Sequence, residues 1–79
     1  MKKLLEFIVT NIVKHPKSVK IEEIQQENEW LVLNLTVHQD DMGQVIGKEG
    51  KIIKSIRNVL RIKAIKNNIR FSLDLKESS

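Results

Sequence analysis

The order in which helical and strand-like hydrophobic patterns follow one another constrains the fold of this chain more than any other feature. Residues 2–14 and 51–66 each carry apolar side chains on one face at the spacing of an α-helix. His15-Pro16 should end the first helix, since the residue before a proline is pushed out of the α region. A shorter helix is expected over residues 40–46, because Asp40-Asp41 has side chains that suit an N-cap.

Three other segments alternate apolar and polar residues with the period of a β-strand. They are residues 18–26, 30–37 and 69–75, and the polar turn at 27–29 joins the first two into a hairpin. The predicted element order is therefore α-β-β-α-α-β. Because each helix and each strand has one apolar face, we predict an α/β chain of the α+β two-layer kind, with helices packed on one face of a three-stranded mixed sheet.

The length of the chain limits what this fold can contain. Seventy-nine residues make one small domain. We expect its core to span about residues 2–75 and residues 76–79 to form a frayed tail. The longest apolar run is far shorter than the ~20 residues that span a bilayer, so no membrane association is expected.

The composition argues against an enzyme or a metal protein. The chain has no cysteine, which excludes disulfides and thiolate metal sites and fits a cytoplasmic location. His15 and His38 are isolated in the sequence and do not have metal-ligand spacing. No Walker loop or dinucleotide-binding fingerprint is present. We therefore predict no catalytic residues, no metal and no cofactor.

Charge is segregated along the chain. Residues 1–20 carry a net charge of +4, residues 21–41 carry −6 without any Lys or Arg, and residues 42–66 carry +6. A basic block of this kind is the electrostatic footprint of a polyanion partner, although it also occurs as an ordinary solvated helix face.

The basic block begins with a short glycine-bounded turn, Gly47-Lys48-Glu49-Gly50. Both glycines can adopt positive φ and have no Cβ, so another backbone can approach the turn closely. The helix that follows points its unpaired N–H groups and the positive end of its dipole at the turn. The turn is therefore a place where phosphates can be held, unless it is only a tight connection between two helices.

This region resembles the KH-domain family. Residues 45–53, VIGKEGKII, match the family's signature of an apolar pair, GxxG and a further apolar residue, and the element order is similar to the type II KH arrangement. GxxG alone is a weak signal, but its position between a short helix and a basic amphipathic helix is more specific. Nearly the whole chain is covered by one KH unit, as in small stand-alone KH RNA-binding proteins of bacteria.

The resemblance implies a non-catalytic protein that binds single-stranded RNA, clamping about four nucleotides of backbone at the GxxG turn while the bases lie in an apolar groove. The glycines would allow close approach, the lysines and arginine would face phosphates, the isoleucines would face bases, and Glu49 would weaken the attraction. The RNA-binding residues it implies are Ile46, Gly47, Lys48, Glu49, Gly50, Lys51, Ile53, Lys54 and Arg57.

Several residues have a second interpretation. Ile53 fits the core as well as it fits a base contact, and Ile56 fits the core better. Trp30 can stack on a base, but its place at the start of a strand favours sheet packing or surface cover.

Ile62 and Ile65 fall outside the apolar face of their helix and are candidates for a partner surface. The resemblance implies pairing with a second copy or with a larger multidomain KH protein. It also implies a role as a post-transcriptional regulator or RNA chaperone. The alternative is a protein–protein interaction or dimerisation module with little intrinsic RNA binding.

Overall fold

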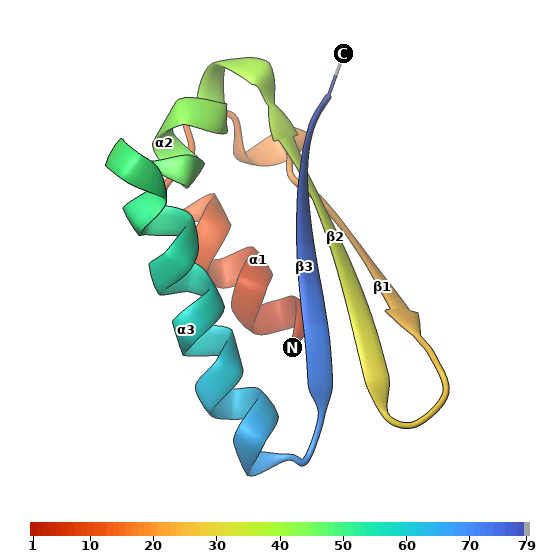
Figure 1. The fold of residues 1–79 in the computed structure, drawn as a ribbon. Helices are drawn as coiled ribbons and strands as arrows, with labels where there is room; N and C mark the ends of the chain where they lie inside the picture. The colour runs from red at the N-terminus through yellow and green to blue at the C-terminus, as the bar shows by residue number, and fades with distance from the viewer. Residues whose placement is uncertain (79) are drawn as a thin grey trace.

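The computed structural model describes residues 1–78 and confirms the predicted order of helices and strands (Figure 1). Short 3₁₀ turns precede β1, α2 and α3. The helices and strands are α1 (Lys2–Thr10), β1 (Lys20–Gln25), β2 (Trp30–His38), α2 (Met42–Ile46), α3 (Lys51–Lys66) and β3 (Arg70–Ser78).

The three strands form a mixed sheet in the order β1-β2-β3, as predicted. β1 and β2 are antiparallel, with Lys20 opposite Thr36, whereas β2 and β3 are parallel, with Trp30 opposite Arg70. Parallel neighbours need a long crossover connection. Here α2, the glycine turn and α3 supply this connection. In the strand order β3 lies at one edge, and it runs beside α3 (Figure 1).

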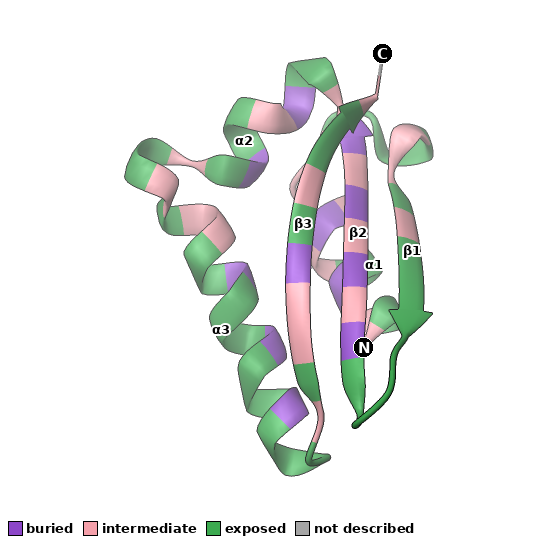
Figure 2. Ribbon diagram, turned by 45° about the vertical axis from the view of Figure 1, so that its right-hand side comes forward, coloured by how far each residue is buried: buried purple, intermediate pink, exposed green. Residues whose placement is uncertain are grey.

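The core lies between the sheet and the helices (Figure 2). β2 is the central strand, and its alternating pattern turns every second side chain toward the helices. Ten buried apolar residues form one cluster, in which each helix and the strands β2 and β3 take part. They are Leu5, Val9, Leu31, Leu33, Leu35, Val37, Val45, Ile56, Leu60 and Leu73. Helices α1 and α3 therefore lie on the same face of the sheet, as predicted.

The first helix is shorter than predicted, because the buried carboxylate of Asp41 binds backbone N–H groups of the segment that follows it. α1 ends at Thr10. The side chain of Asp41 is buried and accepts hydrogen bonds from the backbone N–H groups of Lys14 (2.9 Å) and His15 (3.0 Å). Those amides therefore have partners outside any helix, and the segment turns toward Pro16.

The prediction that Asp41 caps the following helix is wrong for the same reason. Its side chain makes no capping hydrogen bond to α2, and it joins two distant loops instead. Burial alone raises the pKa of Asp41, but the hydrogen bonds from Lys14 and His15, with the nearby His15 and His38, outweigh it and hold the pKa below the ordinary value of 3.8.

The predicted frayed tail is also wrong over the residues that the structure describes. β3 continues to Ser78, and its last residues pair with the end of β2, with Glu77 opposite Val37 and Ser78 opposite His38. The parallel ladder therefore extends past Leu75, where the apolar alternation of the sequence ends. Residue 79 lies outside the described part of the chain.

Candidate nucleic-acid interface

Gly47 occupies a backbone conformation that only glycine adopts readily. It ends α2 with φ 76° and ψ 174°, a region that is essentially closed to residues with a Cβ. A Cβ at this position would also lie 2.5 Å from Cγ1 and 2.8 Å from Cβ of Ile52, in the first turn of α3. Gly47 is therefore required by the fold, because α2 and α3 meet too closely at this point for any side chain.

Gly50 has a different role in the same turn. It is left-handed, with φ 73° and ψ 17°, and immediately precedes α3. A Cβ built on Gly50 would meet nothing within 4 Å. The second glycine therefore faces open space, and its missing side chain leaves the backbone accessible from outside rather than relieving an internal contact.

The two residues between the glycines are presented to solvent. Lys48 and Glu49 are exposed in a single 3₁₀ turn, which is closed by the Gly50 N–H donating to the Gly47 carbonyl at 3.1 Å. Glu49 has φ 57°, a left-handed conformation that is uncommon outside glycine and asparagine. No side chain caps the first turn of α3. The Lys51 N–H donates to the Lys48 carbonyl, so a ligand beside Lys48 would meet the N–H groups that follow Lys51.

A groove lies between the middle of α3 and the edge strand β3. It encloses about 290 Å³ and is lined by Arg57 and Arg61 of α3 and by Phe71, Ser72 and Leu73 of β3. One guanidinium nitrogen of Arg57 donates to the Leu73 carbonyl at 3.3 Å, so this side chain crosses the groove. The groove thus combines a basic wall with an apolar aromatic one.

The charges of α3 are unpaired with carboxylates over residues 1–78. The ion pairs found there involve only the two histidines and Asp40. The acidic side chains Glu22 and Glu23 lie on β1, which is the opposite edge of the sheet from β3. The basic side chains of α3 therefore keep their charge available for a ligand, and they add to the positive end of the dipole of that helix.

The predicted binding residues lie consecutively around the turn and the first half of α3. Lys51, Lys54 and Arg57 are exposed, and Ile46 is 37% exposed. Ile53 is half-buried and packs against the core, which leaves both of its interpretations open.

The burial of three other residues of α3 agrees with what the sequence predicted. Ile56 is buried, in agreement with its assignment to the core. Ile62 and Ile65 are each 70% exposed. Whether they contact a partner stays a prediction.

Arg61 and Phe71 were not among the predicted site residues. Arg61 follows Arg57 by four positions, so both lie on one face of the helix, and that spacing was a usable signal. The position of Phe71 depends on β3 pairing parallel to β2 and placing its free edge beside α3, which no local pattern reveals.

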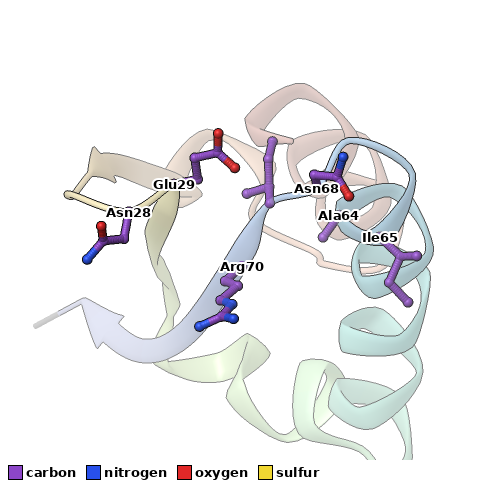
Figure 3. Close-up of a pocket in the computed structure, with 7 residues that line it drawn as sticks. Asn28, Glu29, Ala64, Ile65, Asn68 and Arg70 are labelled. Atoms are coloured by element: carbon purple, nitrogen blue, oxygen red, sulfur yellow. The ribbon is translucent and has the colours of Figure 1, made fainter.

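A larger hollow lies at the other end of α3 and is a weaker candidate (Figure 3). It has a volume of about 490 Å³ and lies between the β1–β2 turn and the C-terminal end of α3, with Ala64, Asn68 and Arg70 among its lining residues. It is roughly 20 Å along the helix from the glycine turn. Arg70 is its one basic side chain and Glu29 also lines it, so it does not suit a polyanion.

None of the helices in residues 1–78 has both the length and the hydrophobicity needed to cross a bilayer.

The element order, the mixed sheet and the GxxG turn between α2 and α3 define a KH domain. The sequence profile of one branch, described as "KhpA/KhpB, KH domain", matches residues 2–75. The chain therefore belongs to the KhpA/KhpB KH-domain family.

Similar proteins agree with this assignment. The chain is 42% identical over 77 residues to the RNA-binding protein KhpA of Chlamydia pneumoniae, covering 98% of this chain and 97% of that protein. It is 43% identical over 75 residues to KhpA of Oceanobacillus iheyensis, covering 95% and 99%. These relatives are named for RNA binding rather than for a reaction, in agreement with the prediction that the chain is not an enzyme.

The fold also matches part of a larger protein. A crystal structure of Era in complex with MgGDPNP and nucleotides 1506-1542 of 16S ribosomal RNA superimposes with a TM-score of 0.63 at 21% identity. Era of Aquifex aeolicus bound to GDP and aluminium fluoride gives 0.60 at 19% identity. These matches cover 95% and 96% of this chain but 28% and 30% of the Era chains, and they show a shared fold.

Proposed function

We propose that this protein binds single-stranded RNA and holds about four nucleotides of its backbone at the glycine turn. The observation that carries the proposal is the open face of Gly50, which lies beside Lys48 and the uncapped start of a basic helix. The names of the relatives that match over nearly the full length support RNA as the ligand.

Each part of the turn then has a physical task. Gly47 lets α2 and α3 meet closely enough to form the turn, and Gly50 lets a sugar–phosphate backbone approach. Lys48 and Lys51 supply charge beside the phosphates, and the first N–H groups of α3 add hydrogen bonds and the helix dipole. Lys54 and Arg57 continue the phosphate track along the helix.

The groove beside α3 favours single strands over duplexes. Its apolar wall, which includes Phe71, can receive unstacked bases, while Arg57 and Arg61 stay near the backbone. We infer that Ile46 and Ile53 offer further apolar contacts to bases nearer the turn. A paired helix hides its bases and cannot place them against this wall. Glu49 reduces the attraction for phosphate, so we expect modest affinity from one domain.

The test is fluorescence anisotropy with short labelled single-stranded RNA at several salt concentrations. A four-nucleotide clamp predicts a log–log salt slope of roughly −2 to −3, at about −0.7 per phosphate neutralised on a single strand. The variant is Lys48→Asp with Glu49→Asp. Aspartate tolerates the left-handed conformation that Glu49 has, so this variant should fold, which circular dichroism can verify.

The matched control is Lys20→Glu, which changes the net charge by the same amount on β1, at the far edge of the sheet. We expect binding to be lost in the turn variant and nearly unchanged in the control. Equal losses in both variants would indicate nonspecific attraction to the positive molecule. No binding by the parent protein would favour a protein-interaction module with little intrinsic RNA binding.

We further propose that the protein acts in the cytoplasm as a post-transcriptional regulator or RNA chaperone, paired with a second copy or with a larger multidomain KH protein. The supporting observation is the exposure of Ile62 and Ile65 on α3. A second KH unit would lengthen the contacted RNA and raise avidity without adding contacts to either domain.

A further inference from the structure

The fold brings together two histidines that are isolated in the sequence. His15 lies in the connection between α1 and β1, and His38 ends β2. Their rings stack with centroids 4.2 Å apart and an angle of 28° between planes. Asp40 completes the group, with its Oδ2 atom 3.7 Å from His15 Nε2 and 3.5 Å from His38 Nδ1.

The backbone around this group is held by a buried interaction. The Asp41 carboxylate accepts hydrogen bonds from the N–H groups of Lys14 and His15, so the loop carrying His15 is tied to the residue next to Asp40. Pro16 restricts the same loop from the other side. The two imidazoles and the carboxylate therefore come from two segments of the chain that the fold already holds side by side.

We propose that His15, His38 and Asp40 form a binding site for a divalent late transition-metal ion, with Zn²⁺ as the reference ion. One ligand atom of each residue lies within 4.8 Å of the others. Around a tetrahedral zinc ion with bonds of about 2.0–2.2 Å, ligand atoms lie roughly 3.3–3.5 Å apart. The distances from Asp40 to the two histidine nitrogens, 3.7 Å and 3.5 Å, are close to this spacing. The histidine nitrogens themselves are within 4.8 Å of each other and their rings are stacked, so the two imidazoles must turn out of the stack to converge on one ion.

The site is open enough to be reached and to keep a water ligand. The side chains are 43%, 32% and 62% exposed for His15, His38 and Asp40. Two imidazoles and one carboxylate favour zinc, nickel or copper over magnesium, which prefers oxygen ligands. Three protein ligands leave the fourth tetrahedral position to water.

One interaction competes with the metal. The backbone N–H of Asp40 donates to His38 Nδ1 at 3.0 Å, so coordination through that nitrogen must displace this hydrogen bond. We therefore expect a weaker site than a closed structural zinc centre. None of these residues belongs to the glycine turn or to the groove beside α3, so this site does not depend on the proposed RNA binding.

The test is isothermal titration of the untagged protein with zinc chloride in a buffer that does not bind metals. The chain has two histidines and no cysteine, so no other imidazole and no thiolate can bind zinc in this titration. We expect one ion per chain and no heat with magnesium. His15→Gln and His38→Gln should each weaken binding at least about tenfold, the lower range of the loss seen when even outer-shell partners of metal ligands are removed.

Asp40→Asn should also weaken binding, while Asp74→Asn, the same change at an exposed position on β3, should leave it unchanged. A second measurement needs no variant: zinc should shift the ring nitrogen resonances of both histidines in the parent protein. The proposal is overturned if zinc moves neither imidazole resonance, or if both folded histidine variants bind zinc as tightly as the parent.

Discussion

The two glycines of the turn should respond very differently to the same substitution. Gly47→Ala places a methyl group 2.5–2.9 Å from three side-chain atoms of Ile52, and it does so in a backbone region that is essentially restricted to glycine. Gly50→Ala places its methyl group in open space, in an ordinary left-handed conformation. The pair therefore separates a glycine that the fold needs from one that only an incoming ligand would need.

The two costs can be estimated separately. For Gly47→Ala, backbone strain costs about 1–3 kcal/mol and overpacking against Ile52 adds about 1–3 kcal/mol. For Gly50→Ala, the left-handed conformation costs about 1–2 kcal/mol, and the stiffer unfolded chain returns about 0.4–1 kcal/mol of this. A chain of this length has a total stability of roughly 4–12 kcal/mol, so Gly47→Ala removes a large share of it.

The assay is urea denaturation followed by circular dichroism, with thermal unfolding as a second measurement. Each kcal/mol should lower Tm by about 4–8 °C in a domain of this size. In a double-mutant cycle, Ile52→Ala should reduce the cost of Gly47→Ala, because two of the three contacting atoms disappear. The reasoning is refuted if Gly47→Ala destabilises no more than Gly50→Ala. On folded protein, Gly50→Ala should still weaken RNA binding if backbone approaches there.

Three further predictions follow from other parts of the structure. Because the pKa of Asp41 is lowered in the folded protein, its carboxylate stabilises the fold fully above pH 3.8, and this stabilisation is lost as the pH falls through the pKa of the folded state. The urea midpoint of Asp41→Asn should therefore depend less on pH below about 4 than that of the parent. Arg57→Ala should reduce the salt slope of RNA binding by about 0.7 and change the free energy of unfolding by only about 0.5–1.5 kcal/mol, because it loses one hydrogen bond to Leu73; an unchanged slope would remove Arg57 from the phosphate track. Ile62→Glu and Ile65→Glu should alter stability by no more than about 0.5 kcal/mol, but sedimentation equilibrium should show loss of any self-association, and a parent that is already monomeric at high concentration would count against this surface.

The elements with strong periodicity could be predicted from the sequence almost to the residue. The helix over residues 51–66 matches α3 at both ends, and the clean alternation over residues 30–37 lies within β2. In both segments the local pattern and the tertiary burial agree, because one face of each element meets the core. The glycine turn before α3 was recognisable because glycine has backbone freedom that its neighbours lack.

The errors occurred where distant residues decide the local conformation. Nothing near Asp41 in the sequence indicates that its carboxylate binds the amides of Lys14 and His15, which ends α1 early and leaves α2 without that cap. The extension of β3 to Ser78 depends likewise on pairing with His38. The stacking of His15 on His38 is a third case, since residues 23 positions apart have no local signal of contact.

The parallel pairing of β2 with β3 has a consequence for how the molecule folds. Hairpin partners of β1 and β2 are 6 to 16 residues apart, whereas each residue of β2 pairs with one 40 positions later in β3. Closing so long a loop is entropically costly, so this pairing should be a late event. The groove between α3 and β3 does not exist until then. A nascent chain that already contains the whole glycine turn would still lack one wall of its binding surface, and capture of RNA by the groove would have to wait until β3 is in place.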